Sequence, residues 1–268
     1  MKITLRMALT TLLCLYIPQA LAITKGQITV NDGQHGPRLI TYEVVGNYAI
    51  TEGDIIIDKV AVLKAKRASV INGINGTLWP QGILPFELSE DLPISNKLTV
   101  LQAIVLWQKK TNLRFIELTS KNRSEYPDYI SFVPGYDRTC ASFVGKQKGA
   151  QIIILSPRCD AMNTVHEIGH ASGLWHEQSR EDRDKYVRIL WENIEEEHRF
   201  NFEQHLTDGR DVKEYDYDSI MHYGPNAFSK NGFKTIVPLV ENAEIGQRNH
   251  LSELDIAAIN SMYPFGEG

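Results

Sequence analysis

The chain has 268 residues, of which 43% are hydrophobic and 23% charged, and its formal net charge is −5. Without internal repeats or low-complexity tracts, this composition predicts one globular domain. The acidic balance argues against a nucleic-acid partner and against attraction to an anionic membrane surface, because both need clustered basic side chains.

Residues 1–22 have the pattern of a secretory signal peptide. Lys2 and Arg6 precede an apolar run over residues 7–17, and Ala20-Leu21-Ala22 provides small residues for cleavage. The run is too short to cross a bilayer as a helix, and no other long apolar segment follows. We therefore expect an exported, extracellular protein without a membrane anchor.

The next predicted elements are one helix and three strands. A helix is predicted to begin at Ser95, whose side chain suits an N-cap. Its apolar face would consist of Leu98, Leu101, Ile104 and Val105. Short runs rich in β-branched and aromatic residues then predict strands over residues 113–118, 129–133 and 151–155.

The most informative segment is residues 166–176, which read HEIGHASGLWH. On a helix, His166 and His170 lie one turn apart and direct two imidazoles at one point. Gly173 permits a left-handed turn that ends the helix and brings His176 to the same point. The pattern predicts a metal site with three imidazole ligands.

Three neutral imidazoles leave the fourth position of a tetrahedral site open, as in catalytic rather than structural zinc sites. We expect one Zn²⁺ ion, although nitrogen ligands alone would also accept copper. Glu167 directly follows the first ligand, and its side chain would lie beside a metal-bound water as a general base. The alternative is an amphipathic helix with two hydrogen-bonded core histidines and a surface glutamate.

Two further helices are predicted, over residues 191–206 and 252–262. In the second, Ser252 and Asp255 form a capping box. We expect the charged face of the first to be solvated; it carries Glu195, Glu196, Glu197 and His198. No ligand role is expected for His35, His198, His205 or His250.

The pattern HExxHxxGxxH is that of the metzincin metalloproteases. Residues 176–184 (HEQSREDRD) and 217–224 (YDSIMHYG) resemble the astacin family in particular, as do residues 235–238 and 245–263. The similarity extends over about residues 78–265. It implies an α+β fold of two lobes. The N-terminal lobe would hold the metal helix and a twisted sheet with mainly antiparallel edges, and an irregular C-terminal lobe would end in a helix.

The resemblance also implies a secreted zinc endopeptidase with roles for single residues. Met221 would lie beneath the imidazoles in the Met-turn, with His222 as a structural neighbour. Tyr223 would bind zinc at rest and donate a hydrogen bond to the oxyanion during turnover. Glu167 would take a proton from zinc-bound water and later protonate the leaving amine. Burial as an ordinary core residue is the alternative for Met221 and Tyr223.

Cys140 and Cys159 are the two cysteines left once Cys14 is removed with the signal peptide. An even pair in an exported chain is expected to form a disulfide. This pair resembles one of the two disulfides usual in astacins. The other, which would tie the early catalytic domain to its C-terminus, has no cysteines here, so we expect looser terminal anchoring.

Residues 23–67 fall outside the resemblance and are interpreted as a propeptide that precedes a catalytic domain at residues 68–268. Residues 51–54 (TEGD) resemble the family's latency segment Phe-x-Gly-Asp, whose aspartate takes the open zinc position. Asp54 is therefore the candidate latency switch, although Thr51 stands in place of phenylalanine. A simple turn over residues 52–54 is the alternative.

The basic cluster at residues 64–67 (KAKR) suits trypsin-like cleavage that would free Ala68. Because 8 of the 28 basic and 5 of the 33 acidic residues precede Ala68, cleavage would leave a formal charge of −8. A solvated charge run is the equal alternative. By resemblance, the new amino terminus would reach a buried network near Glu177.

The resemblance implies that residues 149–153 form an edge strand that pairs with an extended protein or peptide substrate. A monomer is favoured. Two other functions are open at this stage: a catalytically silent module that holds polypeptide, and a zinc hydrolase of a non-protein substrate such as a cell-wall crosslink. Intact Glu167 and Tyr223 argue against the silent module.

Overall fold

The computed structural model describes residues 24–31, 37–65, 71–72, 76–205 and 211–265. The predicted signal peptide, His35 and the cleavage residues Lys66 and Arg67 lie outside the described residues. No described helix combines the length and the apolar character that crossing a bilayer requires.

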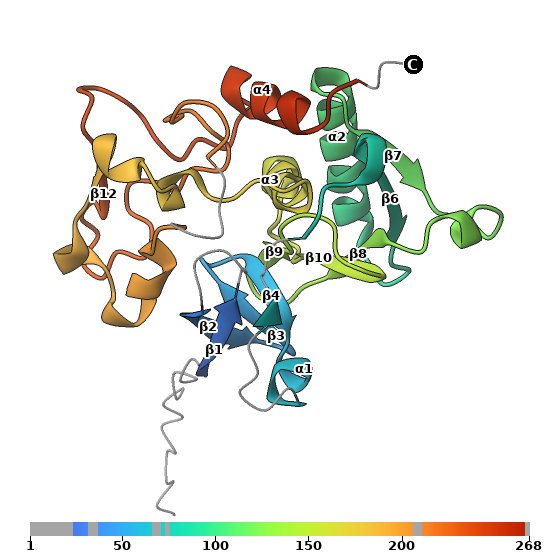
Figure 1. Ribbon diagram of the computed structural model, residues 1–268, viewed down its shortest axis with the longest axis horizontal. Coiled ribbons are helices and arrows are strands. Elements are labelled where there is room, and N and C mark those ends of the chain that lie inside the picture. The colour runs from blue at the N-terminus through green and yellow to red at the C-terminus, as the bar shows by residue number, and fades with distance from the viewer. Residues whose placement is uncertain (1–23, 32–36, 66–70, 73–75, 206–210, 266–268) are drawn as a thin grey trace, which may run out of the picture.

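The described chain forms three parts around the central helix α3 (Ala161–Ala171), as Figure 1 shows. A leader segment, residues 24–65, lies below α3, a sheet lobe lies to the right and a C-terminal lobe to the left. The leader and the sheet lobe share one ten-stranded sheet in the order β5-β1-β2-β3-β4-β9-β10-β8-β6-β7. This architecture confirms the α+β, two-lobed prediction.

The leader segment is folded as an antiparallel meander. Its elements are β1 (Lys25–Asn31), β2 (Pro37–Val45), β3 (Tyr48–Thr51), β4 (Ile55–Lys59) and α1 (Val60–Ala65), and β5 (Ile71–Asn72) pairs with β1. A two-residue turn joins β2 to β3, with Gly46 at a φ of +58°. Apolar side chains including Val30, Ile40 and Ile57 form its core, against which Trp175 packs. The leader therefore has its own apolar core and an apolar contact with the rest of the chain.

The sheet lobe holds the largest core. Its strands are β6 (Ile83–Leu88), β7 (Arg114–Glu117), β8 (Tyr129–Pro134), β9 (Cys140–Ser142) and β10 (Ala150–Leu155). β6, β7, β8 and β10 are parallel, and β9 is antiparallel to β10. Residues from these strands, from α2 (Ile94–Lys110) and from α3 form one buried cluster. Because every side chain from Thr164 to Ala171 is buried, α3 lies at the centre of the molecule.

Helix α2 is present as predicted, but the predicted N-cap is wrong, and of the predicted apolar face only Ile104 is buried. The helix begins at Ile94 after Pro93, without a side-chain cap from Ser95. Its buried residues include Val100, Ala103, Ile104 and Trp107, whereas Leu98, Leu101 and Val105 are exposed. The helix turns its tryptophan to the core because the Trp107 indole N–H donates to the Val165 carbonyl of α3 at 3.1 Å. The apolar face predicted from the sequence instead contains Leu98 and Leu101.

The predicted helix over residues 191–206 is absent as an α-helix among the described residues. Two short 3₁₀ segments, Trp191–Asn193 and Glu196–Phe202, take its place. His198 is buried rather than solvated, and its Nδ1 lies 2.7 Å from the Glu43 carboxylate of the leader. Contact with the leader thus overrides the pattern of a solvated helical face.

The predicted edge strand over residues 149–153 is confirmed only in part: β10 lies between β8 and β9, but among the described strands Ala150–Ile152 pair with β8 alone. β9 has only three residues, which is too short to be recognised from periodicity, and it covers Ile153–Leu155. The strand beside the leader is therefore β9, whose Ser142 pairs with Ile55 of β4.

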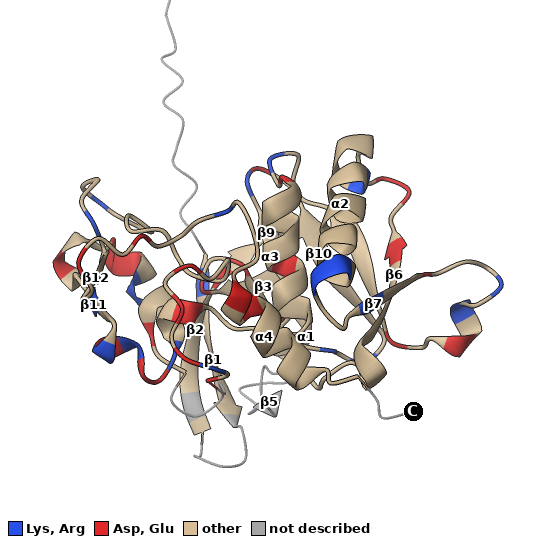
Figure 2. Ribbon diagram, turned by 90° about the horizontal axis from the view of Figure 1, so that it is seen from above, with Lys and Arg blue, Asp and Glu red and all other residues tan. Residues whose placement is uncertain are grey.

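The C-terminal lobe is irregular, as predicted, and contains the two-stranded sheet β11 (Val187–Ile189) and β12 (Ile236–Pro238). It ends in α4 (Glu253–Met262), where the capping box of Ser252 and Asp255 is confirmed. Figure 2 shows acidic and basic segments interspersed over both lobes.

The two faces of α2 permit a matched test by the same substitution. Val100 is 0% exposed and Val105 is 61% exposed. Val100→Ala removes buried apolar surface and should lower the free energy of unfolding by about 1–3 kcal/mol, whereas Val105→Ala should change it by less than about 0.5 kcal/mol. Urea unfolding measures both; equal effects of the two substitutions would contradict the observed face.

Candidate metal centre and active site

Helix α3 starts and ends where it must to present two histidines. Asp160 caps its first turn through a capping box with Asn163. At its C-terminus Gly173 has a φ of +105°, and its N–H donates to the His170 carbonyl at 2.7 Å. This turn redirects the chain, so that His176 reaches the same point as His166 and His170.

The three imidazoles meet through their Nε2 atoms, while each Nδ1 has a partner on its other side. His166 Nδ1 lies 2.8 Å from the Ile220 carbonyl, and His170 Nδ1 lies 2.8 Å from the Leu174 carbonyl. His176 Nδ1 lies 2.9 Å from the Glu52 carboxylate. Since these partners are acceptors, each Nδ1 carries the proton and each Nε2 presents a lone pair to the centre.

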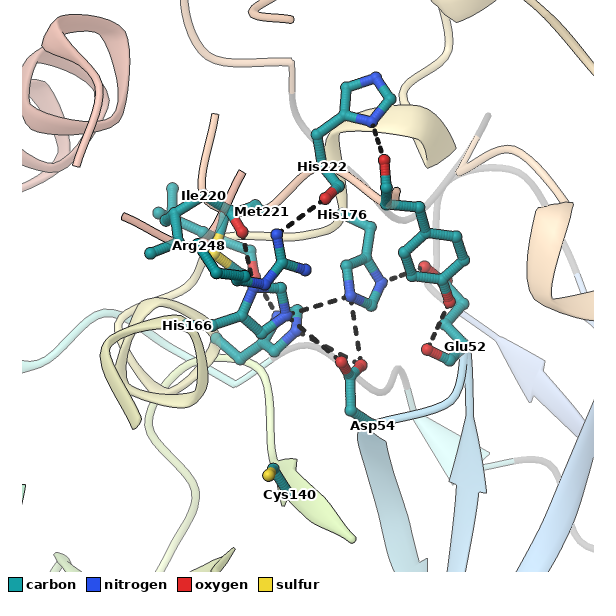
Figure 3. A network of polar contacts seen from close by, with 12 residues as sticks. Glu52, Asp54, Cys140, His166, His176, Ile220, Met221, His222 and Arg248 are labelled. Carbon is teal, nitrogen blue, oxygen red and sulfur yellow. Dashed lines mark hydrogen bonds and ion pairs between the residues drawn. The ribbon is translucent and has the colours of Figure 1, made fainter. Parts of the chain in front are cut away.

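Asp54 of the leader closes the site opposite the imidazoles (Figure 3). Its carboxylate oxygens lie 3.3 Å from His166 Nε2, 3.5 Å from His170 Nε2 and 3.2 Å from His176 Nε2. Together they form a group whose ligand atoms all lie within 4.8 Å of one another. Asp54 is therefore placed to be a fourth ligand of a metal ion held by the three imidazoles.

The donor set fits one zinc ion. His176 Nε2 lies 3.3 Å from His166 Nε2, and His170 Nε2 and Asp54 Oδ1 are buried without hydrogen-bond partners in the described part of the chain. Lone pairs that converge in this way repel one another unless a cation lies between them. Burial disfavours a charged imidazole at His176, but Asp54 and Glu52 outweigh it and raise the pKa of His176 to about 9, so without a metal ion a proton takes the Nε2 position that the metal would occupy. The cluster therefore attracts positive charge.

Glu52 is a site residue that the sequence patterns missed, although it lies in the predicted turn. The turn is real, with positive φ angles of 48° at Glu52 and 76° at Gly53, and it delivers Asp54 to the imidazoles. The Glu52 carboxylate is buried and also accepts hydrogen bonds from Ser179 Oγ at 2.9 Å and from His205 Nε2. The turn and the latency interpretations are thus compatible.

Thr51 does not reproduce the role of an apolar anchor. Its side chain is buried within the leader, where Oγ1 donates to the Thr41 carbonyl at 3.1 Å. An aromatic contact comes instead from the C-terminal lobe, because a Cβ on Gly53 would lie 3.0 Å from the Phe228 ring.

Glu167 is buried next to the metal ligands, at 2% exposure, and its Oε2 has no hydrogen-bond partner among the residues that the structure describes. Burial, with a further contribution from Asp54, raises the pKa of Glu167 well above its ordinary range. A buried carboxyl group with a raised pKa can accept and return a proton near neutral pH.

Tyr223 serves as a core residue and also faces the site. Its ring packs in the C-terminal lobe cluster with Phe202 and Phe228 and lies 4.7 Å from the His176 ring. Its hydroxyl donates to the Glu52 carbonyl at 2.5 Å. Burial raises the pKa of Tyr223 well above 10, so the phenol keeps its proton as a donor.

The Met-turn lies against α3 as predicted. Met221 is buried, and a Cβ on Gly169 would lie 2.8 Å from its sulfur, so glycine permits this close packing. Asp255 of α4 holds the turn by accepting hydrogen bonds from Ser219 Oγ at 2.7 Å and from the Ile220 N–H at 2.9 Å. The α4 cap therefore also positions the carbonyl that orients His166.

Two further contacts fix the chain next to the Met-turn. The Tyr215 hydroxyl and His222 Nε2 lie 2.7 Å apart, which agrees with a structural role for His222. Arg248, missed by the sequence patterns, donates to the His222 carbonyl at 3.0 Å and lies beside the site in Figure 3. Gly246, two residues before Arg248, packs closely on Gly224. A Cβ atom added to Gly246 would lie 2.2 Å from the Gly224 Cα atom.

The predicted disulfide is present. Cys140 and Cys159 are joined with their Cα atoms 6.0 Å apart, which ties β9 to the segment before α3. The outer edge of β9 receives the leader, since the Ser142 N–H donates to the Asp54 carbonyl at 2.9 Å. An extended backbone can therefore lie along β9 beside the imidazoles.

Glu177 lines a separate cavity of about 60 Å³ behind His176. Its carboxylate accepts from the Asp216 N–H at 2.7 Å and lies 3.5 Å from Arg180 Nη1. Burial raises the pKa of Glu177 to about 8. The cavity is large enough for a small polar group or water.

Comparisons with known proteins agree with this geometry. The profile of the peptidase family described as Astacin matches residues 72–264. Zinc metalloproteinase nas-13 of Caenorhabditis elegans is 41% identical over 189 residues, which are 69% of this chain and 40% of that protein. Zinc metalloproteinase nas-4 of the same organism is 35% identical over 231 residues, which are 82% of this chain and 70% of nas-4.

Among solved structures, the hatching enzyme zinc-protease HCE-1 from Oryzias latipes (medaka fish) has a TM-score of 0.63 and 36% identity to this chain. The match covers 71% of this chain and 94% of HCE-1. The chain spans less than half the length of nas-13. The family profile and the near-complete coverage of HCE-1 show that the chain belongs to the astacin family of metallopeptidases.

Proposed function

We propose that this chain is a secreted zinc-dependent endopeptidase made as a latent precursor. The observation that carries the proposal is the contact of Asp54, from the leader, with the Nε2 atoms of all three histidines. A site built only for structure would not need a displaceable carboxylate from an N-terminal segment. In the latent chain the fourth position is closed by Asp54, and removal of the leader opens it.

His166, His170 and His176 would hold the zinc, which when bound acts as a Lewis acid toward water and the scissile carbonyl. Glu167 accepts the proton of the attacking water and transfers it to the leaving amine. The Tyr223 hydroxyl, which meets a peptide carbonyl in the latent chain, donates to the oxygen of the scissile peptide as negative charge develops there.

The substrate is a protein or peptide bound in extended form along β9. The hydrogen bond from the Ser142 N–H to the Asp54 carbonyl supports this assignment, because it uses main-chain groups alone. Removal of the leader would return that strand edge to the substrate. The proposed enzyme is a monomer. The proposal includes neither a nucleic-acid partner nor a membrane anchor.

Export and processing complete the proposal. Residues 1–22 act as the signal peptide, residues 23–67 as the propeptide and residues 68–268 as the catalytic domain, with cleavage at the 64–67 basic cluster. The disulfide between Cys140 and Cys159 supports an oxidising compartment. Mass spectrometry of the secreted chain reports the N-terminus directly.

In the processed enzyme, the substitution Glu167→Gln should remove most of the turnover but leave the metal bound. The substitution preserves the size of the side chain and removes the proton acceptor, so kcat should fall roughly 10²–10⁴-fold. Peptide hydrolysis and zinc content are measured on the same preparation. A zinc-loaded variant with full activity would rule out Glu167 as the base.

In the leader-bearing chain, the substitution Asp54→Ala should make the metal accessible to substrate and to a small inhibitor. Loss of the carboxylate contact should raise peptidase activity and the affinity for a small hydroxamate by at least about ten-fold, which corresponds to ~1.4 kcal/mol. Asp58→Ala is the control, because Asp58 bonds the Lys59 N–H within the leader. If Asp54→Ala stays as closed as the parent in both assays, Asp54 is not the switch.

We further propose that the Glu177 cavity receives the amino terminus of the processed chain. A buried carboxylate beside a small cavity is stabilised by an ammonium group. A short N-terminal extension of the processed chain should lower its Tm by about 2–4 °C for each ~1 kcal/mol lost. The extension should have no further effect in Glu177→Gln; additive effects would exclude the contact.

A further inference from the structure

The three imidazoles differ in the origin of their hydrogen-bond partners. His166 and His170 are oriented by the backbone carbonyls of Ile220 and Leu174, which stay with the protease after processing. His176 is oriented by the Glu52 side chain, which belongs to the leader and is 124 residues away in sequence. One of the three ligands therefore depends on a segment that is removed.

The Glu52 carboxylate occupies a built site. Glu52 is 4% exposed, and its carboxylate contacts His176 Nδ1 at 2.9 Å, Ser179 Oγ at 2.9 Å and His205 Nε2. Its backbone is held as well, because the Tyr223 hydroxyl donates to its carbonyl. A non-glycine residue at a φ of +48° is uncommon, and here the contacts of its carboxylate and its carbonyl hold it in that conformation.

A carboxylate behind a metal-bound imidazole has a known physical effect. It fixes the tautomer and the direction of the ring, and it makes the imidazole a stronger donor to the metal. Glu52 meets both requirements, since it accepts from Nδ1 and leaves the Nε2 lone pair directed at the site. Among the described residues, no other acceptor contacts His176 Nδ1.

We propose that the leader supplies Glu52 as the positioning residue of His176, so that the latent chain binds zinc more tightly than the processed chain. This effect is separate from the direct contact of Asp54, and it rests on the proposed function in assuming that zinc occupies the site and that the leader is removed. The leader then increases the zinc affinity of the site and also closes its fourth position. Its departure leaves His176, which is fully buried, without the acceptor seen here.

The test uses the full leader-bearing chain and measures zinc affinity by competition with a chromophoric chelator. Glu52→Ala should weaken zinc binding by about 10–100-fold, the usual cost of losing such a partner. Glu52→Gln keeps an acceptor oxygen of the same size and should recover much of the loss. Cobalt(II) in place of zinc should show a changed visible spectrum in Glu52→Ala.

Glu43→Ala is the matched control, because Glu43 is also a leader carboxylate that contacts a histidine, His198, but not a metal ligand. It should leave zinc affinity and the cobalt spectrum as in the parent. Thermal unfolding with excess zinc checks that each variant is folded.

Parent affinity in Glu52→Ala, or an equal loss in Glu43→Ala, would overturn the proposal. Equal losses would show that loose docking of the leader, not the orientation of His176, sets the affinity. Failure of the proposed function appears elsewhere, as a processed wild-type chain that binds zinc without hydrolysing peptides. The two failures are therefore distinguishable.

Discussion

A buried cluster of three imidazoles holds a cation more tightly when each ring is fixed at its outer nitrogen. In this chain the fixing acceptors come from three places: the Leu174 carbonyl just beyond α3, the Ile220 carbonyl of the Met-turn and the Glu52 carboxylate of the leader. The rest of the structure follows from holding these acceptors in place. Asp255 fixes the first residues of the Met-turn, and Gly173 bends the chain so that Leu174 reaches back to His170.

The second constraint is electrostatic. Asp54, Glu52 and Glu167 are brought close to one metal site, and burial in a region of low dielectric makes uncompensated charges costly. A divalent cation compensates them. In its presence the leader is attached by charge at Asp54, by hydrogen bonds at Glu52 and by apolar packing on Trp175. These three kinds of contact hold residues 24–65 against the metal site.

Local signals were sufficient for the parts of the site that are close in sequence. The HExxHxxGxxH spacing and the α4 capping box depend on residues close together in sequence, so the structure agrees with them. Contacts between residues far apart in sequence could not be predicted from the local patterns. The buried face of α2 depends on Trp107 docking on α3, and the edge role of β9 depends on a three-residue strand. Glu52 joins His176 across 124 residues, and Arg248 meets His222 only in the folded chain.

Above all, the three histidines should form one zinc site in the leader-bearing chain. Metal analysis of the purified protein, beside His170→Ala, measures this. His170 is fully buried, and among the described residues its Nε2 has no hydrogen-bond partner, so the position of this atom suits a metal ligand. We expect one zinc per parent chain and a loss of most of it in the variant. A folded parent without zinc, or a variant that keeps a full equivalent, would show that the histidines do not form the site.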